Sequence, residues 1–233
     1  MKVGFVVMLG ENPALGRAPT YGEVRDLVLH AEVAGFDSVW LWDHLIYRQP
    51  NQPARGHWEC WTMLSALAGA TTRIELGTLV LCTPLRNPAV LAKMAVTLDE
   101  VSGGRFTLGL GAGWNKPEFD AFGVPFDHRV GRFEEALQII CPLLREGTVD
   151  FSGTYYHAPD CAILPSGPRQ GGPPILVAAN GPRMLRLTAQ YADSWNVVEL
   201  AQPEGLVKPR TALHAACAKV GRDPGQRWQS RSV

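Results

Sequence analysis

The chain has 233 residues, which is enough to bury the core of one large domain. Its 22 basic and 22 acidic side chains cancel, and no long apolar stretch opens the sequence, so we expect no nucleic-acid partner, no signal peptide and no membrane span. Five cysteines stand far apart without a CxxC pair, a pattern that favours reduced thiols in a cytoplasmic protein.

Hydrophobic runs typical of buried strands alternate along the chain with amphipathic patterns typical of helices. The predicted strands cover 2–9, 38–42, 74–81, 105–110, 175–179 and 194–198, and a further strand is expected to begin near 231–233. The predicted helices run from Thr20 to a stop at Gly35, from Asn87 to a stop at Gly103, and over 58–70, 129–145, 182–192 and 204–220. Repeated strand–helix units predict a parallel sheet, either open or closed into a barrel.

The alternation pauses at 148–173. Residues 149–156 resemble a β-hairpin with a Ser-Gly turn, and a stretch rich in proline and glycine follows it. We expect residues 1–233 to form a single barrel domain in which this segment is an inserted excursion. Because loops determine specificity in such folds, 49–57 and 164–172 are predicted to form the roof of the site.

Polar residues that can do chemistry fall where the predicted strands end. They are Asp43-His44, Cys82-Thr83, the Gly-Ala-Gly-Trp-Asn run at 111–115, and Asn180-Gly181. In a parallel α/β protein the carboxyl ends of the strands share one face, and such folds build their active sites there. The sequence therefore predicts an enzyme with a cofactor site at this edge of the sheet.

Several longer segments resemble the luciferase-like flavin and deazaflavin oxidoreductases, in order and with matching spacing. These segments are 35–45, 76–80, 87–93, 102–114 and 174–196. The resemblance is to the branch that depends on coenzyme F420. It implies a TIM-type (β/α)8 barrel that binds FMN or F420 at the carboxyl ends of its strands. A full barrel needs about 250 residues, so we expect this chain to lack its last one to two βα units.

The resemblance implies roles for residues that follow the second and third strands. His44 stands where F420-dependent relatives place a histidine against the deazaflavin ring, and an imidazole can exchange the proton that accompanies a hydride. Leu79-Val80 matches a bulge where a cis peptide can back the ring. The residues expected to border the cofactor here are Asp43, Leu79, Val80, Cys82 and Thr83. The residues alone also fit a strand-end cap, a plain buried strand and a Cys82 that serves only as a small buried hydrophobe.

The resemblance also implies a phosphate site after the fifth strand. Its predicted residues are Ala178, Ala179, Asn180, Gly181 and Arg183. Free N–H groups and the helix dipole favour an anion at such a helix start, although an ordinary strand-to-helix turn uses the same residues. Gly111, Trp114 and Asn115 are expected to complete the cofactor site, with the glycines of this segment letting the cofactor approach the backbone. Glu118 is expected to be a solvated charge in the first turn of a helix, although members of the family often place an acid there.

These observations predict an F420-dependent oxidoreductase that transfers a hydride between coenzyme F420 and a small organic molecule. An FMN-dependent luciferase-like monooxygenase is the alternative, because both cofactors use nearly the same cradle, and Arg86 and Arg183 are the basic candidates for the acidic tail of F420. A truncated, non-catalytic cofactor-binding protein is a third possibility. An incomplete barrel leaves an apolar wall, so we expect a homodimer. No HExxH or other regular metal-ligand spacing occurs, so no metal site is predicted.

Overall fold

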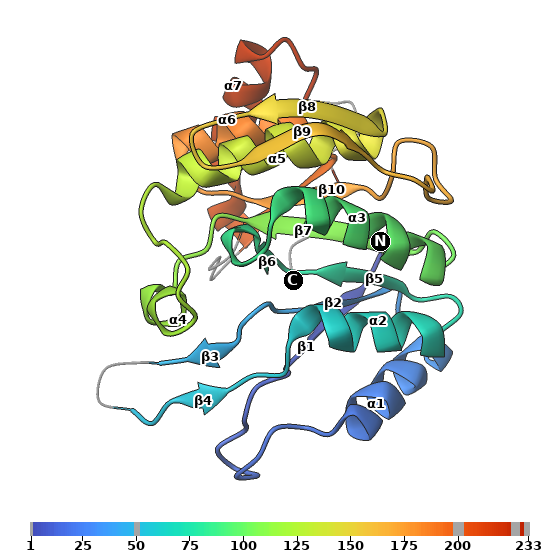
Figure 1. Ribbon diagram of the computed structural model, residues 1–233. Helices are drawn as coiled ribbons and strands as arrows, with labels where there is room; N and C mark the ends of the chain where they lie inside the picture. Colours follow the sequence, from blue (N-terminus) through green and yellow to red (C-terminus); the bar gives the residue numbers. More distant parts are fainter. Residues whose placement is uncertain (1, 49–51, 198–202, 225–228, 231–233) are drawn as a thin grey trace.

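Parallel strands joined by helices form one curled sheet that makes half of a barrel (Figure 1). The computed structural model describes residues 2–48, 52–197, 203–224 and 229–230. Within them the strands lie side by side in chain order: β1 (Gly4–Val7), β2 (Ser38–Leu41), β5 (Glu75–Thr78), β7 (Phe106–Gly111), β10 (Ile175–Ala178), β11 (Ser194–Asn196) and β12 (Gln229–Ser230). The short β6 (Leu81–Cys82) also pairs with β7.

This strand order confirms the predicted parallel α/β sheet of the barrel type. The register is continuous across the sheet, so that Val39 of β2 lies between Phe5 of β1 and Leu76 of β5. The expected further strand near 231–233 lies outside the described residues, and the absence of the last one to two βα units stays a prediction.

Helices connect consecutive strands and pack each against the next (Figure 1). They are α1 (Tyr21–Val33), α2 (Cys60–Ala70), α3 (Pro88–Val101), α5 (Arg129–Arg145), α6 (Pro182–Tyr191) and α7 (Val207–Lys219). The connections also contain the short helix α4 (Lys116–Ala121), the 3-10 turns η1 (Thr83–Leu85) and η2 (Pro203–Leu206), and an antiparallel pair, β3 (Ile46–Tyr47) with β4 (Arg55–Gly56). None of the helices in the described ranges has the length and hydropathy that crossing a bilayer requires.

Local capping signals set the helix starts. The Thr20 hydroxyl accepts a hydrogen bond from the amide of Glu23 at 3.3 Å, and the Glu23 carboxylate accepts one from the Thr20 amide at 2.8 Å. At α3 the Asn87 side chain accepts from two amides of the first turn, ahead of Pro88. These groups satisfy backbone donors that a helix start otherwise leaves unpaired, so both helices begin there. The starts predicted at Thr20 and Asn87 are confirmed.

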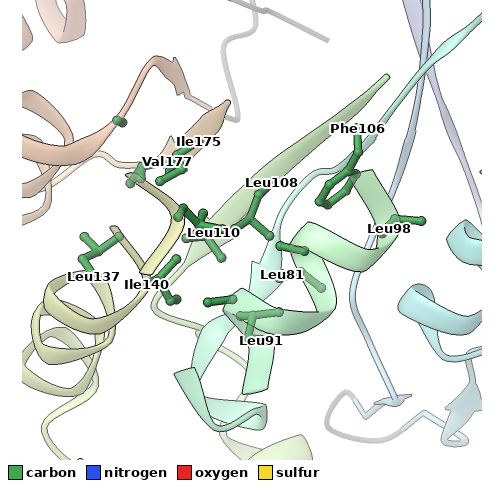
Figure 2. Close-up of a cluster of buried hydrophobic side chains, with 14 of the residues drawn as sticks. Leu81, Leu91, Leu98, Phe106, Leu108, Leu110, Leu137, Ile140, Ile175 and Val177 are labelled. Atoms are coloured by element: carbon green, nitrogen blue, oxygen red, sulfur yellow. The ribbon is translucent and has the colours of Figure 1, made fainter. Parts of the chain in front are cut away.

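The outer face of the sheet forms a hydrophobic core with the helices. Alternate residues of β7 and β10 point toward α3 and α5, where they interdigitate with leucine and isoleucine side chains (Figure 2). The labelled members are Leu81, Leu91, Leu98, Phe106, Leu108, Leu110, Leu137, Ile140, Ile175 and Val177. Burying each such side chain stabilises the fold by about 1.5–3 kcal/mol.

The inner face of the half-barrel is filled by Trp40. The side chain is 1% exposed, and its indole N–H donates to the Ser38 hydroxyl at 3.0 Å. Neighbouring strands make room for it with glycine: a Cβ on Gly77 would lie 2.2 Å from the indole ring. The large side chain on β2 therefore occupies the interior space that the glycine on β5 leaves free.

An antiparallel hairpin lies outside the main sheet, where the alternation of strands and helices pauses. It pairs β8 (Thr148–Ser152) with β9 (His157–Ala162), so the hairpin is confirmed and extends further than the predicted 149–156. Its turn is held by Glu135 of α5, whose carboxylate accepts hydrogen bonds from the three successive amides of 154–156.

The loop at 164–172 does not cover the site, and its predicted role as a roof is wrong. Arg169 donates from Nε to the carboxylate of Asp99 at 2.9 Å and also binds the carbonyl of Phe106. Phe106 is the first residue of β7, so the loop packs at the amino end of the strands. The reason is electrostatic: Asp99 is fully buried and needs a cation, which this loop provides.

We predict that Arg169→Ala lowers the free energy of unfolding by about 3 kcal/mol, because Asp99 would stay buried without its cation. This loss is at the low end of what breaking a buried ion pair costs, because the Arg169 side chain is 30% exposed. Urea unfolding measures the loss. Lys116→Ala is the control: it breaks the exposed pair with Asp120 and should cost less than about 0.5 kcal/mol. Equal losses in the two variants would contradict the role given to the Asp99–Arg169 pair.

Candidate active site

A cavity of about 590 Å³ opens at the carboxyl ends of the strands. Its volume lies within the range of about 300–1,000 Å³ that is usual for small-molecule sites. The predicted site residues that line it are Asp43, His44, Leu79, Val80, Cys82, Gly111, Trp114, Asn115 and Ala178. Those that do not line it are Thr83, Ala179, Asn180, Gly181 and Arg183. The structure thus brings the ends of the second, third and fourth predicted strands together around one space.

One wall of the cavity is formed where the third strand is interrupted. β5 ends at Thr78, a cis peptide joins Leu79 to Val80, and β6 resumes at Leu81, so the predicted continuous strand at 74–81 is divided. The cis peptide lies at the bulge that the sequence indicated. At the break, the Thr78 hydroxyl donates to the carbonyl of Gly109 at 2.8 Å and accepts from its amide at 2.9 Å.

Three glycines after and within β7 allow neighbouring strands to approach closely. A Cβ would lie 1.8 Å from the Thr78 carbonyl oxygen at Gly109, 2.7 Å from Val80 at Gly111 and 2.6 Å from the Cys82 sulfur at Gly113. Close packing of the protein's own atoms therefore already requires glycine at these positions, and the expectation that they give a cofactor access to the backbone stays a prediction. Gly111 and Gly113 still line the cavity.

Asp43 is a buried structural anion at the cavity edge. Its carboxylate accepts a hydrogen bond from the Cys82 amide at 2.9 Å and two from the Arg86 guanidinium at 2.6 and 2.9 Å. Arg86 also donates at 2.6 Å to Glu59, which caps the start of α2. Burial opposes the charge of Arg86, but the two carboxylates raise its pKa above the ordinary value. Arg86 is therefore bound inside the protein and does not stand at the pocket rim.

His44 is held by a buried glutamate. Glu118 is 1% exposed, and its carboxylate lies 3.3 Å from His44 Nδ1. The same carboxylate accepts hydrogen bonds from the backbone amides of Leu45 at 2.5 Å and Ile46 at 3.2 Å. Burial alone would raise the pKa of Glu118, but these hydrogen bonds hold it below its ordinary value. An ionised carboxylate only accepts, so Nδ1 carries the hydrogen and Nε2 is left available. The expectation that Glu118 is a solvated charge is wrong.

Aromatic rings surround His44 on the cavity wall. The centroid of its imidazole lies 5.7 Å from Tyr47, 5.6 Å from His57 and 5.8 Å from Trp114. All four side chains line the cavity, and Trp114 is exposed at its mouth. Such a wall favours a substrate with apolar or aromatic surface beside a polar group that His44 can reach.

Three predicted site residues, Cys82, Thr83 and Asn115, are buried. The Asn115 amide donates to the carbonyl of Ile46 at 3.2 Å, so it fixes the loop that carries His44. Burial raises the pKa of Cys82 to about 12, so its thiol stays protonated and is no nucleophile at neutral pH. The Thr83 hydroxyl is buried and finds no hydrogen-bond partner among the described residues.

The predicted phosphate residues form the turn between β10 and α6. The Ala179 carbonyl accepts the indole N–H of Trp195 at 2.8 Å, while Asn180 and Gly181 are exposed just before the helix. Arg183 donates to Glu134 at 2.6 Å, and Arg186 donates to the other oxygen of the same carboxylate at 2.6 Å. Of this group only Ala178 reaches the cavity wall.

Sequence reasoning gave Tyr47 no site role, included His57 only as a member of the predicted roof segment 49–57, and misjudged Glu118. In the sequence Glu118 resembles any first-turn acid, and only the fold brings it to residues 44–46, more than seventy positions away. His57 could not be singled out within that segment, because it belongs to no spaced motif. Across the ranges that the structure describes, no three His, Cys, Asp or Glu side chains gather as metal ligands would.

Comparisons with known proteins agree with this geometry. Phthiodiolone/phenolphthiodiolone dimycocerosates ketoreductase of Mycobacterium tuberculosis (strain H37Rv) is 35% identical over 96% of this chain and 62% of its own length. Pyrimidine monooxygenase RutA of Bradyrhizobium sp. is 36% identical over 72% of this chain and 48% of its own. A solved F420-dependent secondary alcohol dehydrogenase, in complex with an F420-acetone adduct, is similar with a TM-score of 0.80 at 25% identity, covering 97% of this chain and 66% of that one.

The chain spans about three fifths of the mycobacterial relative, which it covers over 62% of that protein's length. The sequence profile of the family described as luciferase-like monooxygenase matches residues 1–229, almost the whole of this chain. With the half-barrel and the cavity at its carboxyl edge, this match shows that the chain belongs to the luciferase-like monooxygenase family.

Proposed function

We propose that this protein is an F420-dependent oxidoreductase that transfers a hydride between coenzyme F420 and a small organic substrate. The observation that carries the proposal is the His44–Glu118 pair, which leaves one imidazole nitrogen available at a cavity beside the ends of parallel strands. Two similar proteins are named as a ketoreductase and a secondary alcohol dehydrogenase, the second of them F420-dependent. A ketone and its secondary alcohol are therefore the substrate class to test first.

The cavity wall suits a flat deazaflavin ring. Leu79 and Val80 supply an apolar surface, and Gly111 and Ala178 are small enough to leave room beside it. Sites for planar cofactors are mostly apolar with a few placed polar groups, and this lining has that character. When bound in its reduced form, F420 supplies the hydride.

His44 is the residue that we propose moves the proton. When a ketone is reduced, a hydride adds to the carbonyl carbon and the oxygen takes a proton, which Nε2–H of His44 can donate. The neutral imidazole that remains keeps its Nδ1–H, which stays hydrogen-bonded to the Glu118 carboxylate. In the direction of alcohol oxidation, Nε2 accepts the hydroxyl proton. Tyr47 and Trp114 pack against His44 and limit the access of water to it.

We infer that a phosphate group of the cofactor binds at 178–181 and the first turn of α6. Gly181 stands at the N-cap without a side chain that could occupy the free N–H groups. Arg183 and Arg186 share the single carboxylate of Glu134, which leaves one positive charge at this helix start. Arg86 takes no part in this site, because Asp43 and Glu59 bind it.

An FMN-dependent monooxygenase is the alternative function. The RutA relative and the family description favour it, because both are named as monooxygenases. The same apolar wall would accept an isoalloxazine ring, so the choice rests on measured affinities.

We also propose a cytoplasmic homodimer. All five cysteines are free thiols, as expected in a reducing compartment. An open half-barrel exposes strand edges that a second copy can cover, and light scattering on the purified protein measures the mass directly.

We predict that the purified protein binds F420 saturably and at least about tenfold more tightly than FMN, a difference of about 1.4 kcal/mol. Fluorescence titration with each cofactor measures both dissociation constants. The deazaflavin without its phosphate and glutamate tail is the matched control and should bind more weakly than F420. Tighter binding of FMN would move the protein to the monooxygenase alternative, and binding of neither would show that the family's cofactor function does not carry over to this chain.

His44→Ala should lower the rate of hydride transfer by about 10²–10⁴-fold, because it removes the general acid–base group. Glu118→Gln should lower it by about 10–100-fold, the usual loss when an orienting partner is removed. Stopped-flow absorbance of F420 with a series of ketones follows the step. The control is Asp120→Asn, an exposed carboxylate on the same short helix, which should leave the rate unchanged. A Glu118→Gln enzyme with the wild-type rate would refute the orienting role.

The stability that Glu118 contributes should depend on pH. Its pKa is lower in the folded protein than its ordinary value of 4.5, so this stability is complete above pH 4.5 and is lost as falling pH protonates the folded carboxyl. The difference in unfolding free energy between wild type and Glu118→Gln should therefore shrink when urea titrations are repeated from pH 6 downward. A difference that does not change with pH would show that the carboxylate is not held as an anion.

A further inference from the structure

A second imidazole, which the proposed reaction does not use, lies on the same cavity wall as His44. His57 lines the cavity, and its ring centroid is 5.6 Å from that of His44 and 6.3 Å from that of Tyr47. No residue in the described part of the chain hydrogen-bonds its ring nitrogens. A half-buried imidazole with both nitrogens available is positioned to bind a ligand.

Backbone pairing fixes where His57 stands. Gly10 and His57 form an isolated antiparallel bridge. Two backbone hydrogen bonds flank it: the Glu11 amide donates to the Gly56 carbonyl at 2.9 Å, and the Trp58 amide donates to the Leu9 carbonyl at 3.2 Å. The imidazole lies directly over Gly10, where a Cβ would be 2.4 Å from the ring. The loop after β1 thus holds the ring in place without occupying its nitrogens.

The surroundings of His57 favour its neutral form. Burial lowers its pKa below the ordinary value of 6.5, and the nearby His44 and Arg55 act in the same direction. Glu118 and Glu11 oppose this shift, but the net effect is a lowered pKa. At pH 7 the ring therefore offers one N–H donor and one acceptor, whereas His44 has its Nδ1 committed to Glu118.

We propose that His57 is a second catalytic residue, whose imidazole hydrogen-bonds the substrate oxygen that exchanges a proton with His44. This inference rests on the proposed function and specifies its substrate as one with a carbonyl or hydroxyl group. In the reduction, hydride from reduced F420 adds to the carbonyl carbon, the π electrons move to the oxygen, and His44 supplies the proton. His57 transfers nothing; it donates a hydrogen bond to the oxygen as negative charge develops there.

Three variants separate hydrogen bonding from filling of space. His57→Phe keeps a ring without an N–H, His57→Asn keeps a donor in a smaller side chain, and His57→Ala keeps neither. With acetophenone, a neutral ketone suited to the aromatic wall, His57→Phe and His57→Ala should lose about 10–100-fold in kcat/KM. His57→Asn should retain more activity than either. The dissociation constant for F420 should stay within about twofold in all three, because a single lost substrate contact leaves cofactor binding intact.

A result in which His57→Phe matches wild type, or falls no lower than His57→Asn, would overturn the proposal. Thermal unfolding of each variant, followed by circular dichroism, identifies any that fail to fold. His57→Asn and His57→Phe remain a matched pair, because each fills part of the space over Gly10.

A second measurement does not depend on turnover. Imidazole resonances of His57, assigned by their absence in His57→Asn, are recorded by NMR in the protein with oxidised F420 and in the protein alone. Acetophenone should shift them, whereas ethylbenzene, which has the same ring and no oxygen, should not. Equal shifts with both probes, or none with either, would refute the contact. If the wild type bound no F420 but acetophenone alone still shifted His57, the cofactor assignment would fail and the oxygen contact would stand.

Discussion

The candidate site depends above all on the buried carboxylate of Asp43. It receives the Cys82 amide and the Arg86 guanidinium, and Arg86 in turn reaches Glu59 at the start of α2. This single network joins the end of β2, the end of β6 and the entries to α2 and α3. Because a buried charge is tolerated only when it is paired, these segments must meet in one geometry. The loop that carries His44 begins at the residue anchored in this way.

Carboxylates near the cavity are satisfied by the protein itself. Asp43 binds Arg86, and Glu118 binds His44 and two backbone amides, so neither presents an unpaired charge to a ligand. Aromatic and aliphatic side chains and two imidazoles form much of the wall, and Glu11 and Arg55 add one charge of each sign to it. Such a surface suits molecules with a large apolar area and a few polar groups. The phosphate of a cofactor would have to bind elsewhere, and the start of α6 offers a surplus positive charge.

Features determined by neighbouring residues could be predicted from the sequence. The long helix α5 has the predicted ends, and Thr20 forms the predicted capping box, because periodicity and caps act within a few residues. Features that depend on distant partners could not. Glu118 resembles a solvated acid until the fold places it under the loop of His44, and the glycine positions of β7 acquire their reason only beside β5 and β6. The loop at 164–172 was misplaced because its target, Asp99, lies far away in the sequence.

The division of the cavity between two stretches of chain has a consequence for how such proteins diversify. The segments that carry the imidazoles and aromatic rings all precede residue 120, whereas the turn before α6 lies more than fifty residues later and makes separate contacts. A recombination junction within α5 would exchange the part that carries the imidazoles and aromatic rings and keep the part that carries the turn before α6. Homologous fragments exchanged at this helix would therefore change most of the cavity wall in one step and leave the turn before α6 as it is, which makes α5 a natural junction for chimeric proteins.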